Sequence, residues 1–155
     1  MATAHAFETT QMRNSRNLVA TVTPMRSALF EQSPEAQLLI DPHNDRVLCA
    51  NAAARSLLGY SWEALSGESA SRLFEEQLGG LIVFTQAVLH QGQGWTDRLR
   101  CRTREGQEIS VECHATTLRA AGRDLLLMAL RDIAACRLRL ERSRANELVR
   151  RGLSE

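Results

Sequence analysis

The 155-residue chain contains no lysine, so arginine supplies all 19 of its basic residues. With 18 acidic residues the formal net charge is +1, which excludes a strong overall attraction to nucleic acid or to an acidic membrane. No stretch approaches the roughly 18 consecutive apolar residues of a membrane span. The polar segment from Met1 to Thr23 also lacks the apolar run of a signal peptide. We therefore expect a cytoplasmic protein with no membrane partner.

Closely spaced cysteines are also missing, since none of the four lies in a Cys-x-x-Cys pair. This spacing excludes the usual zinc and iron–sulfur motifs. In a reducing compartment we expect Cys49, Cys101, Cys113 and Cys136 to be thiols that behave as small hydrophobic side chains. At Cys136, beside Arg137, an alternative is oxidation or a disulfide across a dimer, because positive neighbours favour the thiolate.

Motifs of common enzyme classes are absent as well. The sequence has no glycine-rich phosphate loop, no metal-ligand motif and no nucleophile elbow. Glu75 and Glu76 are adjacent, and neighbours on a helix diverge by about 100°, so we expect solvated charges that do not share a site. We predict a protein without catalytic residues and without a metal site.

Hydrophobic periodicity divides the chain into short elements. We expect helices over 25–32, 52–58, 62–65, 69–77 and 81–90, and an arginine-rich helix over 133–151. Strands are expected over 36–41, 46–50, 95–103, 108–118 and 124–133. Apolar and polar residues alternate along 108–118, which predicts one buried and one solvated face. Two strands, several helices and three further strands indicate an α+β fold, preceded by a mobile leader over 1–23.

The stretch from 51 to 67 resembles the core signature of the PAS family. An asparagine opens a helix, a Gly-Tyr pair ends it, and a glycine closes the next turn; a tryptophan, a hairpin glycine and an Asp-Ile pair follow at the expected places. These positions are Asn51, Gly59, Gly67, Trp95, Gly106 and Asp132. The resemblance covers 25–135. It implies a five-stranded antiparallel sheet with short helices on one face, a PAS domain over 24–133 and a signalling helix or linker over 134–155.

The resemblance implies a role in sensory or regulatory signalling, because PAS modules occur in sensor kinases, transcription regulators and cyclic-dinucleotide enzymes of bacteria. We expect a homodimer that passes a conformational signal to a downstream effector domain through the helix that carries Ile133, Leu140 and Leu148. The apolar spacing of this helix is too irregular for a long coiled coil, and a solvated tail is the alternative. Its arginines suit phosphate, but no helix-turn-helix or aromatic stacking residue accompanies them, so we predict no nucleic-acid binding.

A ligand pocket is expected where small side chains face inward. Cys113 and Ala115 stand where haem-binding relatives carry larger groups, which leaves room for a small apolar or weakly polar ligand. The expected lining is Leu57, Phe74, Phe84, Val88, Leu99, Cys101, Val111, Cys113, Ala115 and Met128. The alternative is a ligand-free dimerisation or docking module whose gap is filled by Phe74, Phe84 or Met128.

Haem and flavin are further alternatives for the cofactor. His90 is the candidate haem ligand, and Trp95 resembles a tryptophan of flavin-binding members. The reactive cysteine of light-sensing flavin relatives has no counterpart, because no cysteine lies between Cys49 and Cys101. The nature of the cofactor therefore stays open at this point.

Overall fold

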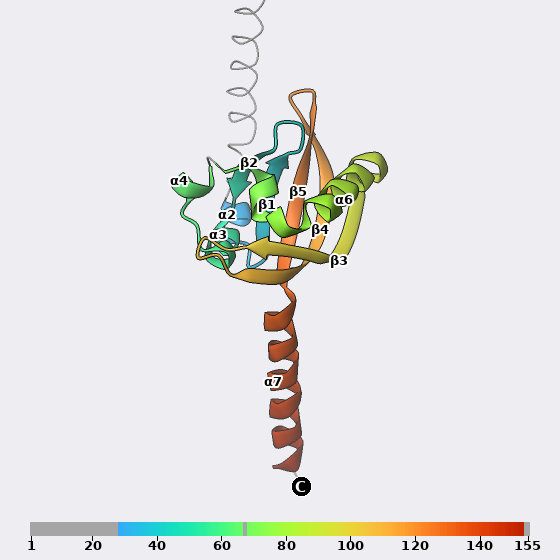
Figure 1. Cartoon of the computed structure of the whole chain (residues 1–155). Coiled ribbons are helices and arrows are strands. Elements are labelled where there is room, and N and C mark those ends of the chain that lie inside the picture. The colour runs from blue at the N-terminus through green and yellow to red at the C-terminus, as the bar shows by residue number, and fades with distance from the viewer. Residues whose placement is uncertain (1–27, 67, 154–155) are drawn as a thin grey trace, which may run out of the picture.

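Five strands form one antiparallel sheet in the computed structural model, which describes residues 28–66 and 68–153. The strands are β1 (Ala36–Asp41), β2 (Arg46–Ala50), β3 (Gln93–Arg102), β4 (Glu108–Ala120) and β5 (Arg123–Asp132), and their order is β2-β1-β5-β4-β3. The early hairpin thus joins the late strands through β1 and β5, as Figure 1 shows. The predicted α+β class and PAS-like sheet are confirmed.

Most helices connect β2 to β3. They are α3 (Ala52–Leu58), α4 (Trp62–Leu65), α5 (Ala70–Leu73), the 3₁₀ helix η2 (Glu75–Gln77) and α6 (Leu78–Gln91). Before the sheet comes α2 (Ala28–Gln32), and after it comes α7 (Ile133–Gly152). The predicted leader, residues 25–27 of the first predicted helix, and Gly67 lie outside the described residues. No helix within the described ranges is long and apolar enough to cross a membrane.

The single helix predicted over 69–77 is wrong. The chain leaves α5 at Phe74, whose φ of −121° and ψ of 28° are not helical, and whose side chain is fully buried. Burial of this ring turns the backbone, and the 3₁₀ turn η2 leads into α6. Helix α6 then begins at Leu78 and not at 81, because packing overrides the low helix propensity of its two glycines.

Glu75 and Glu76 are solvent-exposed, as expected, and both contact Arg102. Arg102 Nη1 lies 3.4 Å from Glu75 Oε2, and Arg102 Nη2 lies 3.0 Å from Glu76 Oε1. The guanidinium is a planar fork wide enough to reach both carboxylates of a tight 3₁₀ turn. Both glutamates are solvent-exposed and Arg102 is half-buried, so the cluster links η2 to β3 at the surface.

Asn51 connects α3 to β1 through its side chain. Its Oδ1 accepts hydrogen bonds from the backbone N–H of Ala54 and of Gln37, each at 2.9 Å, and its Nδ2 donates to Glu35 O at 2.7 Å. The first of these bonds is the predicted helix cap. The other two pair backbone groups at the start of β1, so one fully buried amide holds a helix against the sheet.

Gly59 and Gly94 each occupy a position where a side chain is disfavoured. Gly59 ends α3 at φ +74°, in the left-handed region that glycine tolerates. At Gly94, on β3, an added Cβ would lie 2.7 Å from Val88 Cγ2 and 3.2 Å from Phe84 Cε2. The absence of a side chain there lets α6 pack directly on β3.

Two apolar clusters cover the two faces of the sheet. The larger lies between the inner face and the helices, and includes the fully buried Leu38, Leu58 and Leu126. The smaller lies on the outer face, where Phe30 of α2 packs with Leu125. The alternation predicted along β4 is confirmed: Val111, Cys113 and Ala115 are buried, whereas the intervening side chains are more accessible.

Candidate functional site

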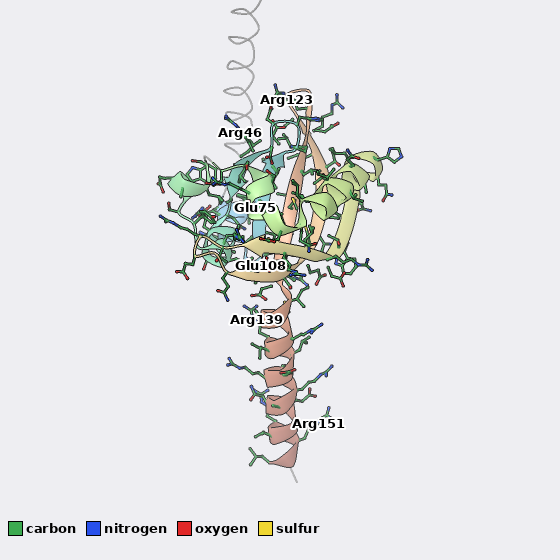
Figure 2. The ribbon with its side chains drawn as sticks, in the orientation of Figure 1. Arg46, Glu75, Glu108, Arg123, Arg139 and Arg151 are labelled. Carbon is green, nitrogen blue, oxygen red and sulfur yellow. The ribbon has the colours of Figure 1, made fainter. Side chains whose placement is uncertain are left out.

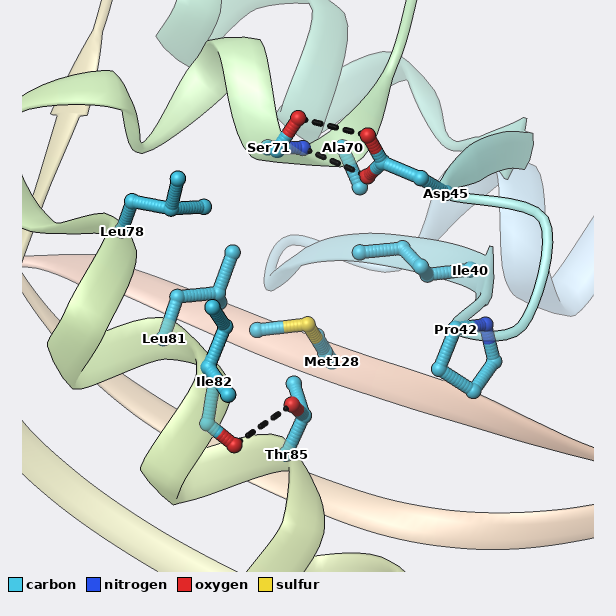
Figure 3. A pocket seen from close by; sticks show the side chains of 10 residues that line it. All are labelled: Ile40, Pro42, Asp45, Ala70, Ser71, Leu78, Leu81, Ile82, Thr85 and Met128. Carbon is cyan, nitrogen blue, oxygen red and sulfur yellow. Dashed lines mark hydrogen bonds between the residues drawn. The ribbon is translucent and has the colours of Figure 1, made fainter.

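A pocket of about 350 Å³ lies between α5, α6 and the turn that joins β1 to β2 (Figure 3). Its apolar lining comes from Ile40, Pro42, Ala70, Leu78, Leu81, Ile82 and Met128, and its polar lining from Asp45, Ser71 and Thr85. This volume lies within the range of roughly 300–1,000 Å³ found for small-molecule sites. Mostly apolar walls with a few polar groups are also typical of such sites.

The polar edge of the pocket is built around Asp45. Its Oδ1 accepts from the Ser71 backbone N–H at 2.8 Å, and its Oδ2 accepts from Ser71 Oγ at 2.5 Å. Ser69, the residue that precedes α5, makes no capping bond with its side chain. Asp45 therefore replaces it and joins the β1–β2 turn to α5. Its φ of +50° is a conformation that aspartate tolerates better than most residues.

The ten residues predicted to line a pocket come together in one inner cluster. Eight are buried there, and Leu57 and Phe84 pack against them partly buried. Met128 is the member of this set that also lines the pocket of Figure 3. The pocket lies towards the β1–β2 turn, whereas Cys113 and Ala115 are buried on β4 and do not line it.

Sequence reasoning missed the polar edge. The turn signal at 42–45 was visible, and Asp45 fits a left-handed position. Its partner Ser71 lies 26 residues further along the chain, so no local pattern links the two.

Burial makes the inner thiols poor nucleophiles. Burial raises the pKa of Cys113 to about 12, and it raises the pKa of Cys101 further, with Cys113 nearby as a lesser cause. Cys49 is buried on the outer face. The prediction of buried, apolar thiols is confirmed for these three, whereas Cys136 is partly accessible.

A polar–aromatic group lies on the outer face of β3 and β4. Trp95 Nε1 donates to Glu112 Oε1 at 2.7 Å, and His114 Nε2 lies 3.2 Å from the same oxygen. The bond from Trp95, followed by that from His114, lowers the pKa of the Glu112 carboxyl. Trp95 is 52% exposed, so its indole stands at the surface and not beside the pocket.

The two cofactor candidates do not fit the pocket. His90 is exposed in the last turn of α6 and is not one of the lining residues, so it does not fit axial ligation of a haem there. Trp95, on the opposite face of the sheet, does not fit a flavin in this pocket. Within the described ranges, no group of three or more His, Cys, Asp or Glu is arranged to hold a metal ion.

The pocket is directly connected to α7 along one strand. Met128 lies on β5, and four residues later Asp132 ends the strand and caps α7, since its Oδ1 accepts from Ala135 N at 3.1 Å. Helix α7 projects from the domain (Figure 1), and none of its residues is buried. Arg139 and Arg151 extend from it into solvent in Figure 2.

Solved structures share this fold. The PAS domain of a protein from Colwellia psychrerythraea matches with a TM-score of 0.63 at 20% identity, over 72% of this chain and 97% of that one. A PAS domain from a two-component sensor histidine kinase gives 0.59 at 19% identity, over 67% and 89%. The PAS domain of a LuxR-family transcriptional regulator from Burkholderia thailandensis, in complex with ethanol, gives 0.59 at 13%, over 70% and 97%.

The sequence itself matches one family model. A search of curated proteins finds no match to this sequence. The model described as the PAS fold matches residues 25–133, which is most of the chain. The matched segment contains the sheet, the pocket and the Asn51 cap. The chain therefore belongs to the PAS fold family.

Proposed function

We propose that this domain is a sensory or regulatory module in which occupancy of the pocket changes the position of α7. The observation that carries the proposal is the placement of Met128, which belongs to the pocket lining and to the strand that continues into α7. A ligand that contacts Met128 pushes on β5, and the displacement reaches Asp132 within four residues. No residue of helix α7 is buried, so little packing resists such a displacement.

The comparisons support a sensory role. Domains of this fold occur in a sensor histidine kinase and in a LuxR-family regulator, and the latter was solved with ethanol bound. By analogy, we infer that α7 leads to an effector domain and that the pocket holds a small organic ligand. We also place the domain in the cytoplasm, and we expect α7 not to bind nucleic acid.

Filling the pocket with a side chain tests the connection to α7. Ile82 lines the pocket and is 48% exposed, so Ile82→Trp is expected to occupy the mouth without disrupting the core. Hydrogen–deuterium exchange should then change roughly twofold or more at amides 133–140, because a shifted β5 alters the first turns of α7.

Val83→Trp provides the matched control, because Val83 is the next residue of α6, is 71% exposed and does not line the pocket. Exchange at 133–140 should stay at the wild-type level in this variant. If Ile82→Trp folds, as judged by circular dichroism, and leaves exchange in α7 unchanged, the pocket and the helix are not coupled and the proposal fails.

A second candidate function is dimerisation through α7. Leu138, Ala145 and Val149 lie at i, i+7 and i+11, which places them on one helical face, and Leu138 and Val149 are 57% and 60% exposed. The predicted contact residues Leu140 and Leu148 lie on another side and are 59% and 69% exposed. Solvent-exposed leucines on an isolated helix favour helix–helix contact.

Sedimentation velocity of the full chain distinguishes the two faces. We expect a dimer, which Leu138→Glu with Val149→Glu should dissociate. Leu140→Glu with Leu148→Glu tests the face predicted from the sequence. A wild-type chain that stays monomeric at about 100 μM would remove dimerisation as a function of this segment.

A further inference from the structure

We propose that the pocket selects a small aliphatic amine in its protonated form and discriminates against carboxylates. This inference rests on the proposed function, since it requires the pocket to hold a ligand. It is carried by the polar groups of the lining, which all present hydrogen-bond acceptors, and by the negative charge of Asp45.

Each side-chain hydroxyl that lines the pocket already donates its proton in a hydrogen bond within the protein. Ser71 Oγ lies 2.5 Å from Asp45 Oδ2 and 3.4 Å from Ser69 Oγ, so its proton goes to the carboxylate. Thr85 Oγ1 donates to Ile82 O at 3.1 Å, as drawn in Figure 3. A hydroxyl has one proton and two lone pairs, so both oxygens face a ligand as acceptors.

The carboxylate of Asp45 has acceptor capacity left. Its two oxygens offer about four lone-pair sites, and Ser71 uses one on each oxygen. An ammonium group has three donors and no acceptor, and therefore complements Asp45 and Ser71 at the polar edge, while Thr85 offers a separate acceptor across the pocket in Figure 3. A carboxylate ligand has acceptors alone and would meet no donor from these side chains.

The charges around the pocket also favour a cationic ligand. Asp45 is the one charged residue of the lining, although the chain carries 19 arginines. In the same turn, the Asp41 carboxylate lies 3.4 Å from Arg123 Nη1, so this guanidinium already has an acidic partner. A cationic ligand gains Coulomb attraction at this edge, whereas an anionic one is repelled.

The apolar walls set the shape of the ligand. Leu78, Leu81, Ile82 and Met128 line the pocket across from Asp45, and Ile40 lies on the same side as Asp45, as Figure 3 shows. A hydrocarbon chain can therefore lie against these side chains while its head group reaches the polar edge. Six carbons fit comfortably in about 350 Å³.

Three probes with the same six-carbon chain test the inference: hexylamine, 1-hexanol and hexanoate, titrated into the full chain at pH 7 and equal ionic strength. Binding is followed by amide shifts of Ile82 and Thr85 in NMR spectra. We expect hexylammonium to bind about tenfold more tightly than hexanoate, with 1-hexanol between them, since partly exposed charge pairs contribute modest free energies.

Asp45→Asn removes the charge and keeps an acceptor for the Ser71 N–H, and asparagine also tolerates a positive φ. In this variant the ratio between hexylammonium and hexanoate should fall to within about twofold, while 1-hexanol binds as before. Asp97→Asn is the charge-matched control, because Asp97 is exposed on β3 outside the pocket lining, and it should keep the wild-type ratio.

The outcomes separate the inference from the proposed function. If no probe shifts the pocket amides, the pocket does not bind small organic ligands and the proposed function loses its support. If hexanoate binds as tightly as hexylammonium, the pocket binds ligands but the inference is overturned. An amine preference that survives Asp45→Asn also overturns it. The order of the three affinities in the wild-type protein tests the inference even if Asp45→Asn does not fold.

Discussion

Replacing Asn51 with alanine removes three side-chain hydrogen bonds from a fully buried position. Loss of the cap on α3 costs about 1 kcal/mol. The Gln37 N–H and the Glu35 carbonyl lose partners as well, each worth about 1–3 kcal/mol when buried. Both residues are half-buried, so water recovers part of this cost. We expect the free energy of unfolding to fall by about 3 kcal/mol.

Urea denaturation followed by circular dichroism measures this change. A loss of about 3 kcal/mol moves the midpoint down by roughly 2 M urea for a domain of this size. Ser61→Ala is the matched control, because Ser61 caps α4 with one exposed bond of 3.3 Å to Ala64 N, and its loss should cost about 0.5 kcal/mol. If Asn51→Ala costs less than about 1 kcal/mol, the bonds to β1 do not stabilise the fold as argued.

Three further predictions concern packing, charge and thiol reactivity. Gly94→Ala should lower the free energy of unfolding, measured by urea denaturation, by about 1–3 kcal/mol, because the added Cβ would clash with side chains of α6. Gly79→Ala is the control: Gly79 is exposed, so this change should be neutral or stabilising. Equal effects of the two substitutions would contradict the close packing of α6 on β3. Trp95→Phe should raise the depressed pKa of Glu112, measured by ¹³C NMR of its carboxyl. A carboxyl with a depressed pKa stabilises the fold at pH values above its unfolded pKa, and this stabilisation is lost as pH falls through the folded pKa. The free energy of unfolding of the variant should therefore fall less steeply on acidification than that of the wild type. An unchanged pKa of Glu112 in the variant would show that the indole is not the main cause of the shift. Ellman's reagent should modify one native thiol quickly, and Cys136→Ser should abolish that phase; a remaining fast phase would mean that a buried thiol is accessible.

Local signals in the sequence were sufficient for most of the elements. The asparagine at 51 and the glycine at 59 bound α3 because a cap and a left-handed residue act within a few positions of the chain. Alternation along β4 identified its buried side, since successive strand residues face opposite ways. These local rules predicted the α+β class. Phe74, Val88 and Cys113 were expected to line a ligand pocket, and in the structure they pack together in the inner cluster.

The tertiary structure alone decided where space remains beside that cluster. The pocket depends on Asp45 reaching Ser71 across 26 residues, and on a break at Phe74 that separates α5 from α6. Arg102 likewise bridges Glu75 and Glu76 from another strand. Such contacts join segments far apart in the chain, so their geometry follows from packing in three dimensions and has no signature in local periodicity.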